Sequence, residues 1–409
     1  MFYLYSVLIR GGKVIDGTAK PSYQADIAID DDRIVAIAEN IKEPAQVVID
    51  ADNQVVTPGF IDIHSHTDET IFSSPLAESK LMQGVTSEVI GNCGIGLFPT
   101  IKERVPDLEQ YAKVHAFVLG PKGITWEDFS DYAEELAKLS LGPNLLPLVA
   151  HGALRIAAMG FDNRPPTEVE LTAMKNLLRA ALQDGAWGMS TGLIYPPGSF
   201  AQTHELISLA QVLAEYETLF TTHVRGESGA LLTAIEEAIT ISRSSGARVE
   251  VSHLKALGQP NWGKGQAALA MILAAQQEGV TIGADQYPYE ASSTSLTALV
   301  PEWAHAGGIE KLLVRLENPL LQERLQAETK HELYVRGGPE RVMIANLGSA
   351  EQAELSGLTV AAIAGKWHMA PVDTVFKLLI DNGGTVGAVY FSISGDDVAA
   401  IVSSPEVAV

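Results

Sequence analysis

The hydrophobic and polar positions of the chain follow different patterns on either side of residue 57. Before it, short apolar runs are separated by Gly, Pro, Asn and Asp, which is typical of short strands joined by turns. These runs do not alternate with helical patterns, so they predict a small β domain over residues 1–57. The predicted strands are residues 6–10, 13–15, 26–30, 33–38 and 46–50.

From residue 58, apolar runs typical of buried strands alternate with amphipathic segments typical of helices. The clearest predicted helix is residues 167–183, where Thr167 and Glu170 have the spacing of a capping box and Gly185 follows the end. Such alternation predicts parallel βαβ units. The other predicted helices are residues 203–217, 229–243 and 265–277. The predicted strands are residues 59–64, 86–90, 145–150, 188–191, 219–223, 248–253 and 281–286.

Seven such strands before residue 290 favour a (β/α)8 barrel over an open doubly wound sheet. Polar residues cluster at the carboxyl ends of several of them, which is where barrels place their active sites. We therefore predict an α/β fold, a TIM-like barrel whose first seven strands lie in residues 58–289. The N-terminal strands are predicted to build a small β-sandwich domain.

The alternation breaks down after the seventh strand. A Pro-Glu-Trp sequence at 301–303 and a charged stretch at 323–331 precede an apolar run at 386–393. We predict an insertion over residues 290–385 that serves as a lid, and the start of the last barrel segment over residues 386–409. The closing EVAV resembles the opening of another buried strand, so we expect a chain truncated at its C-terminus.

Composition and charge narrow the class of protein. Hydrophobic residues make up 46% of the chain and charged residues 19%, which suits a globular protein with a large core. A net charge of −22 argues against nucleic acid or an anionic membrane as a partner. The sequence has no apolar run of membrane-spanning length and no signal peptide pattern. A single cysteine, Cys93, excludes an internal disulfide and predicts a cytoplasmic protein.

Histidine or cysteine lies at the carboxyl ends of four of the predicted barrel strands, where active sites form. The side chains are nitrogen and sulfur donors of the kind that zinc prefers, so the sequence predicts a metal centre. Asp62 and Asp285 are interpreted as structural, and His151 as either a support for the metal ligands or a structural residue. The remaining histidines, in helical or inserted segments, are treated as ordinary. The predicted ligands are His64, His66, Cys93, His223 and His253.

Seven stretches of the chain resemble the amidohydrolase superfamily and, within it, the N-acyl-D-amino-acid deacylases (D-aminoacylases). The resemblance runs from the N-terminus to about residue 305 and more faintly to the end. The GNCG sequence is the feature that points to the deacylases. The stretches are IRGGKVIDG (9–17), PGFIDIHSH (58–66), GVTSEVIGNCG (84–94), GLIYPPG (192–198), THVR (222–225), SHLK (252–255) and DQYPY (285–289).

The resemblance implies a zinc ion bound by Cys93, His223 and His253, with His64 and His66 forming a second, weaker site. The thiolate would replace the carboxylated lysine used elsewhere in the superfamily, and the fourth strand of this chain offers no lysine. By the same resemblance, the residues that hold the substrate carboxylate or polarise its amide are Tyr195, Lys255 and Tyr287.

One departure from the family pattern concerns proton transfer. Family members carry an aspartate after the eighth strand, and the matching position would lie beyond Val409. Asp396 and Asp397 precede that strand and are poor substitutes. The sequence therefore predicts a truncated or inactive form and leaves the catalytic residue unknown.

The expected reaction is zinc-dependent hydrolysis of the amide of an N-acyl-D-amino acid to a carboxylate and a free D-amino acid. Two alternatives remain open: a cyclic amidase of the hydantoinase or dihydroorotase type on the same barrel, and a zinc-binding homologue without turnover. The expected partner is a small-molecule substrate. The preferred side chain, the acyl group, the number of metals and the oligomeric state do not follow from the sequence.

Overall fold

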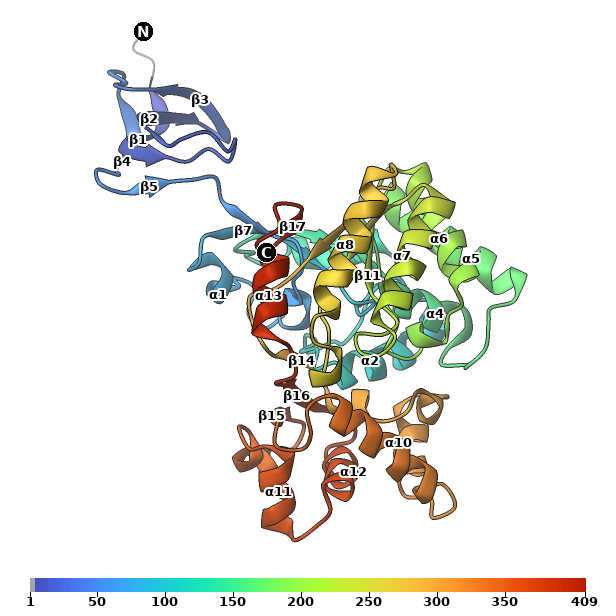
Figure 1. Ribbon diagram of the computed structural model, residues 1–409. Coiled ribbons are helices and arrows are strands. Elements are labelled where there is room, and N and C mark those ends of the chain that lie inside the picture. The colour runs from blue at the N-terminus through green and yellow to red at the C-terminus, as the bar shows by residue number, and fades with distance from the viewer. Residues whose placement is uncertain (1–3) are drawn as a thin grey trace. The chain divides into compact units, whose positions relative to one another are not determined.

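The computed structural model describes residues 4–409 and divides them into two compact units. One unit runs to Phe60 and includes Gly84–Thr86, and the other comprises Ile61–Gln83 and Ser87–Val409. Figure 1 shows the elements of both units along the chain.

A single mixed sheet forms the N-terminal unit, with the order β3-β2-β1-β4 and with β5 also on β1. β1 is one long strand with an irregular register between Ile9 and Gly12, where two separate strands were predicted. Gly11 adopts a positive φ of 68° at this irregularity, which glycine tolerates at little cost. The described residues of this unit thus supply one sheet where a sandwich was predicted. The strands are β1 (Tyr5–Val14), β2 (Tyr23–Asp30), β3 (Arg33–Ala38), β4 (Ala45–Asp50) and β5 (Val55–Val56).

The larger unit carries the predicted barrel strands in chain order. One sheet has the order β6-β7-β8, and the next continues β9-β10-β11-β12-β13-β17. Neighbouring strands of the second sheet are parallel, and β17 pairs with β13 at the place of an eighth strand. The strands are β6 (Phe60–Asp62), β7 (Val85–Ile90), β8 (Asn144–Pro147), β9 (Val149–Ala150), β10 (Gly188–Gly192), β11 (Leu219–His223), β12 (Arg248–Val251), β13 (Ile282–Asp285) and β17 (Val407–Ala408).

Helices follow the strands and cover their outer side, with α5, α6, α7 and α8 in succession (Figure 1). The capping box predicted at the start of α5 is confirmed, because Thr167 and Glu170 exchange hydrogen bonds. The longer helices are α2 (Val105–Val114), α3 (Phe129–Ala137), α4 (His151–Met159), α5 (Glu168–Gln183), α6 (Thr203–Glu215), α7 (Leu231–Ser245), α8 (Lys264–Gln277) and α13 (Gly395–Val402). The short ones are η1 (Thr67–Glu69), α1 (Glu78–Leu81), η2 (Lys102–Arg104), η3 (Gly198–Phe200) and η4 (Gln259–Asn261).

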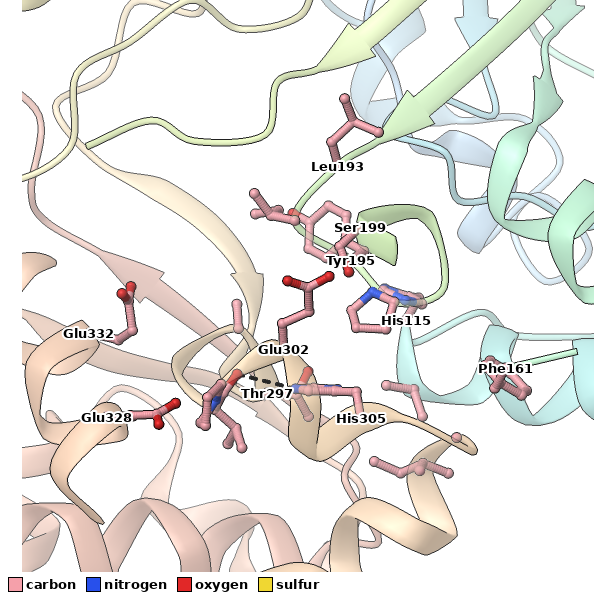
Figure 2. Close-up of a pocket in the computed structure, with 18 of the residues that line it drawn as sticks. His115, Phe161, Leu193, Tyr195, Ser199, Thr297, Glu302, His305, Glu328 and Glu332 are labelled. Atoms are coloured by element: carbon pink, nitrogen blue, oxygen red, sulfur yellow. Dashed lines mark hydrogen bonds between the residues drawn. The ribbon is translucent and has the colours of Figure 1, made fainter. Parts of the chain in front are cut away.

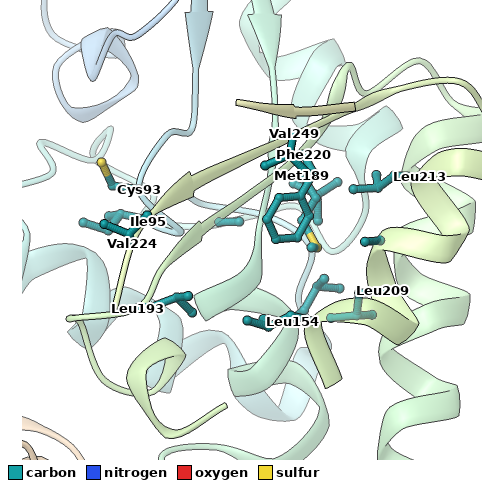
Figure 3. Close-up of a cluster of buried hydrophobic side chains, with 14 of the residues drawn as sticks. Cys93, Ile95, Leu154, Met189, Leu193, Leu209, Leu213, Phe220, Val224 and Val249 are labelled. Atoms are coloured by element: carbon teal, nitrogen blue, oxygen red, sulfur yellow. The ribbon is translucent and has the colours of Figure 1, made fainter. Parts of the chain in front are cut away.

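The main hydrophobic core lies between these strands and helices. Met189, Phe220 and Val249 come from three adjacent strands and pack with Leu209 and Leu213 of α6, as Figure 3 shows. Phe220 is fully buried, so the side of β11 that faces the helices is held by apolar contact. This packing leaves the carboxyl ends of the strands free to carry polar side chains.

An inserted segment follows β13 and has a hydrophobic core of its own. Its three-stranded antiparallel sheet has the order β14-β16-β15. β16 therefore belongs to the insertion, although the sequence placed residues 386–393 in the last barrel segment. The apolar run alone could not reveal which sheet the strand joins. The elements are β14 (Ser292–Ser295), η5 (Leu296–Leu299), η6 (Glu302–His305), α9 (Ile309–Leu316), α10 (Gln322–Val335), β15 (Val342–Leu347), η7 (Ala350–Leu355), α11 (Val360–Trp367), α12 (Pro371–Asp381) and β16 (Val386–Tyr390).

The capping box of α5 makes stability depend on pH. Hydrogen bonds from Arg164, at 2.7 Å on each carboxylate oxygen, are the main reason that the pKa of Glu170 falls from 4.5 to about 2. A carboxyl with a lowered pKa stabilises the fold above its unfolded pKa and loses that effect as pH falls through the folded value.

We predict that Glu170→Gln lowers the melting temperature at pH 7 and that the difference from wild type shrinks between about pH 4.5 and 2. Glu168→Gln is the matched control, because Glu168 lies in the same turn but is exposed. Calorimetry across this pH range measures the effect. A difference that stayed constant with pH would contradict the assignment.

Candidate metal centre

The five predicted ligands meet at the carboxyl ends of the barrel strands. The Sγ atom of Cys93 lies 3.4 Å from Nε2 of His64 and 3.4 Å from Nε2 of His253. The ring centroids of His223 and His253 are 4.3 Å apart, and those of His64 and His66 are 5.6 Å apart. The predicted clustering of these side chains is therefore present in the structure.

His64 and His66 lie in a turn. The strand predicted over residues 59–64 included His64, but β6 ends at Asp62, so both histidines follow the strand. The Ser65 N–H donates to the carbonyl of Val89 at 3.0 Å, which ties this turn to β7. Asp62 is structural, as predicted: its carboxylate accepts from the His64 N–H at 3.1 Å and pairs with Lys80.

Cys93 is held by the glycine-rich turn after β7. The residue has a positive φ of 56°, and Gly94 lies so close to β10 that an added Cβ would come within 2.4 Å of the Gly192 nitrogen. Ser190 of β10 binds the turn through two hydrogen bonds: its hydroxyl donates to the Gly91 carbonyl and accepts from the Gly94 N–H. Because Gly94 and Gly192 have no side chains, the turn can approach β10 closely, and this approach directs the Cys93 thiol toward the histidines.

Two buried carboxylates orient the histidines from behind. Asp285 lies 3.3 Å from Nδ1 of His64 and accepts a hydrogen bond of 2.8 Å from the backbone N–H of His253. Glu227 lies 3.3 Å from Nδ1 of His253 and 3.3 Å from Nε2 of His223. Asp285 was interpreted as structural from the sequence, and its contacts agree. Glu227 was missed, although its place four residues after His223 could have drawn attention to it.

Lys255 lies beside the cluster, and its ammonium group contacts other groups of the protein. Its ammonium group is buried, pairs with Glu227, lies 2.8 Å from Nδ1 of His253 and donates to the His253 carbonyl at 3.1 Å. Among the described residues it lines neither of the two cavities beside the cluster. These contacts tie Lys255 to Glu227 and His253, and the contact with substrate that the resemblance implied stays a prediction.

The two predicted tyrosines each lie near one of the histidines. The ring of Tyr195 is 5.1 Å from that of His223, and its hydroxyl is 2.8 Å from Oγ1 of Thr294 in the insertion. Tyr287 lies 6.3 Å from His253, and its buried hydroxyl has no hydrogen-bond partner within residues 4–409. Both rings are thus near the cluster; the hydroxyl of Tyr287 has no partner among the described residues, and Tyr287 lines neither of the two cavities.

Two cavities open beside the cluster. A cavity of about 240 Å³ is lined by Cys93, His66 and Glu69. A larger one of about 640 Å³ extends toward the insertion, and Tyr195 and His115 line both. Figure 2 shows His115 and Tyr195 in the larger cavity, with Glu302 of the insertion beside them. His115, His305 and His331, which the sequence treated as ordinary, all line this cavity.

Burial and neighbouring charges shift the pKa values at this site. Burial opposes ionisation of the Cys93 thiol, yet the charges of His64 and His253 outweigh it and hold the thiol pKa well below its ordinary value. Burial, helped by His66, lowers the pKa of His115 to about 3. Burial raises the pKa of Glu69 to about 7 against the opposing charge of His66. The cluster therefore favours a thiolate.

His151 belongs to a separate buried network. Its Nε2 lies 2.8 Å from Glu205, whose two oxygens also accept hydrogen bonds of 2.8 and 2.6 Å from Arg155. All three side chains are fully buried. The network joins α4 to α6, so of the two interpretations of His151 the structure supports the structural one.

Comparisons with known proteins agree with this geometry. The sequence model of the Amidohydrolase family matches residues 47–316. The chain belongs to the amidohydrolase family. An N-acyl-D-glutamate deacylase of Alcaligenes xylosoxydans xylosoxydans is 33% identical over 97% of this chain and 71% of its own length. An N-acyl-D-aspartate deacylase of the same organism is 39% identical over 71% of this chain and 57% of its own length.

Solved structures place this amidohydrolase among the D-aminoacylases. The crystal structure of N-acyl-D-glutamate deacylase from Bordetella bronchiseptica, complexed with zinc and a phosphonate inhibitor, superposes with a TM-score of 0.81 at 33% identity. That alignment covers 99% of this chain and 75% of the other. A D-aminoacylase structure described as having a binuclear metal centre gives a TM-score of 0.79 at 31% identity, over 98% and 75% of the two chains. No helix in the described part of the amidohydrolase is long and apolar enough to cross a membrane.

We predict that Glu227→Gln destabilises the fold by about 3–5 kcal/mol, because it leaves the buried ammonium of Lys255 without a counter-charge. The control is Glu236→Gln on the exposed side of α7, which we expect to change the free energy of unfolding by less than ~0.5 kcal/mol. Urea denaturation measures both. The double variant Glu227→Gln/Lys255→Met should recover part of the lost stability. Equal effects of Glu227→Gln and Glu236→Gln on the free energy of unfolding would refute the pairing of Glu227 with Lys255.

Proposed function

We propose that this amidohydrolase binds zinc through Cys93, His223 and His253, with a second, weaker site at His64 and His66. We further propose that it hydrolyses N-acyl-D-amino acids to a carboxylate and a free D-amino acid. The observation that carries the proposal is the position of the Cys93 Sγ, 3.4 Å from imidazole nitrogens of both His64 and His253. A thiolate among imidazoles is a typical zinc environment.

The surroundings of the five side chains fit a bound cation. Nδ1 of His223 is buried and has no hydrogen-bond partner in the described part of the chain. His64 and His253 each direct one ring nitrogen to Cys93 and the other to a charged side chain, Asp285 or the Glu227–Lys255 pair. Metal-binding histidines have the same arrangement, in which the outer partner fixes the ring orientation and tautomer.

The chemistry divides between the cation and the protein. Bound zinc would lower the pKa of a water molecule toward ~7 and polarise the scissile carbonyl. We propose that the hydroxyls of Tyr195 and Tyr287 donate to the substrate carbonyl or carboxylate. Lys255 acts through His253 by fixing its ring. The insertion contributes Thr294, which holds the Tyr195 hydroxyl and lines the smaller cavity, and it also contributes one wall of the larger cavity.

The substrate class follows from the relatives. The curated relatives are deacylases of N-acyl-D-glutamate and N-acyl-D-aspartate and a D-aminoacylase, and the chain spans 57 to 71% of their lengths. A linear N-acyl-D-amino acid is therefore the substrate that we propose for the protein, in preference to a cyclic amide.

The proposal is tested with zinc-loaded protein, N-acetyl-D-amino acids, their L-enantiomers and hydantoin. We expect hydrolysis of the D-compounds only, and loss of activity with a zinc chelator. His253→Asn should reduce kcat/KM by more than the ~100-fold typical of losing a residue that only supports a metal ligand. His204→Asn on the exposed face of α6 is the matched control and should be neutral.

Three outcomes would contradict the proposal. Turnover of hydantoin in preference to N-acetyl-D-amino acids would support the cyclic amidase. Stoichiometric zinc, measured by elemental analysis, without hydrolysis of any substrate would indicate a zinc-binding protein without turnover. Equal zinc content and activity in the His253 and His204 variants would remove His253 from the metal site.

A further inference from the structure

The larger cavity contains a charged side chain that neither the metal centre nor the comparisons explain. Arg336 follows the last turn of α10 in the insertion, is 8% exposed and lines the 640 Å³ cavity. Tyr195 and His115 line the same cavity from the barrel side and also line the smaller cavity that contains Cys93. A ligand that extends from the metal centre past Tyr195 would therefore enter the space that Arg336 faces.

The guanidinium group of Arg336 lacks the partners that a buried charge requires. Its Nε is buried without a hydrogen bond, and its one ion pair within residues 4–409 is to Glu332 at 4.0 Å. It also lies over the ring of Tyr390, 5.0 Å from the ring centre. A buried guanidinium with so little compensation is costly unless an anion completes its hydrogen bonds.

Two other charged groups of the cavity already have partners. Arg225 pairs with Glu237 at 3.0 Å and donates to the Ser199 carbonyl at 2.9 Å. Glu328 accepts from the indole of Trp303 at 2.8 Å. Among the described residues that line this cavity, Arg336 is thus the arginine whose buried Nε has no hydrogen-bond partner.

Tyr390 and β14 connect Arg336 to the metal centre. The hydroxyl of Tyr390, under the guanidinium, donates to the carbonyl of Ser295 at 3.1 Å. Thr294, the preceding residue of β14, holds the hydroxyl of Tyr195, whose ring contacts His223. Two paired strands of the insertion, β16 and β14, therefore contact Arg336 and Tyr195 respectively.

We propose that Arg336 binds a second carboxylate of the substrate, remote from the scissile amide, so that the preferred substrates are dianions. The α-carboxylate is bonded to the carbon that carries the scissile nitrogen, so it stays beside the metal centre, in the smaller cavity that Arg336 does not line. A planar guanidinium matches a carboxylate through two parallel hydrogen bonds. The second carboxylate belongs either to an acidic D-side chain or to a dicarboxylic acyl group. This inference rests on the proposed function and specifies its substrate class.

The test compares non-hydrolysable sulfonamides by calorimetry on the zinc-loaded full chain. N-methanesulfonyl-D-glutamate should bind about 10–100-fold more tightly than its D-glutamine counterpart, the range expected for a charge-assisted pair. A second arm uses D-alanine with a 3-carboxypropanesulfonyl group against its amide, and shows whether the carboxylate comes from the acyl side. The corresponding N-acyl substrates give the same ratios as kcat/KM.

Arg336→Met should reduce the preference to about one, and Arg336→Lys should retain part of it. Arg341→Met is the matched control, because Arg341 is exposed in the same segment and bonds only the Phe391 carbonyl, at 3.3 Å. Circular dichroism establishes that each variant folds. A preference below about twofold in both wild-type arms, or one that Arg336→Met and Arg336→Lys leave intact, would overturn the proposal. Arg336-dependent binding without hydrolysis would refute the proposed function and support the anion site.

Discussion

The structure of this site depends on one requirement: several ionisable groups are buried together, and each needs a partner. Cys93 reaches histidines that lie 29 and 160 residues away in the sequence. Asp285 and Glu227 compensate positive charge on the outer side of the rings, and Lys255 pairs with Glu227. In a buried environment such groups are stable only as a connected set. The parallel barrel makes the set possible, because its strands all end at one edge.

The sequence predicted the parts of this arrangement that local patterns encode. Strand and helix periodicity located the barrel elements, and Thr167 with Glu170 located the start of α5. The metal-binding residue types lie at the carboxyl ends of predicted strands, so their meeting follows once the barrel is accepted. The first barrel strand was predicted to extend to His64 but ends at Asp62, because an apolar run does not show where hydrogen bonding ends.

Other features depend on contacts between distant residues and could not be predicted. Lys255 has the sequence position of a substrate contact, and only the structure shows that Glu227 engages it. β16 has the apolar pattern of a barrel strand, but its partners are β14 and β15. Arg336 lies at the end of a helix in a segment with weak periodicity, and its burial depends on Tyr390, 54 residues further along the chain.

X-ray absorption at the zinc edge tests most directly whether sulfur and nitrogen donors bind the zinc. For the zinc-loaded wild type we expect a sulfur scatterer at ~2.3 Å together with nitrogen scatterers at ~2.0–2.1 Å. In Cys93→Ser, which removes the single cysteine of the chain, the sulfur shell should disappear. A wild-type spectrum with nitrogen and oxygen scatterers alone would contradict the central claim.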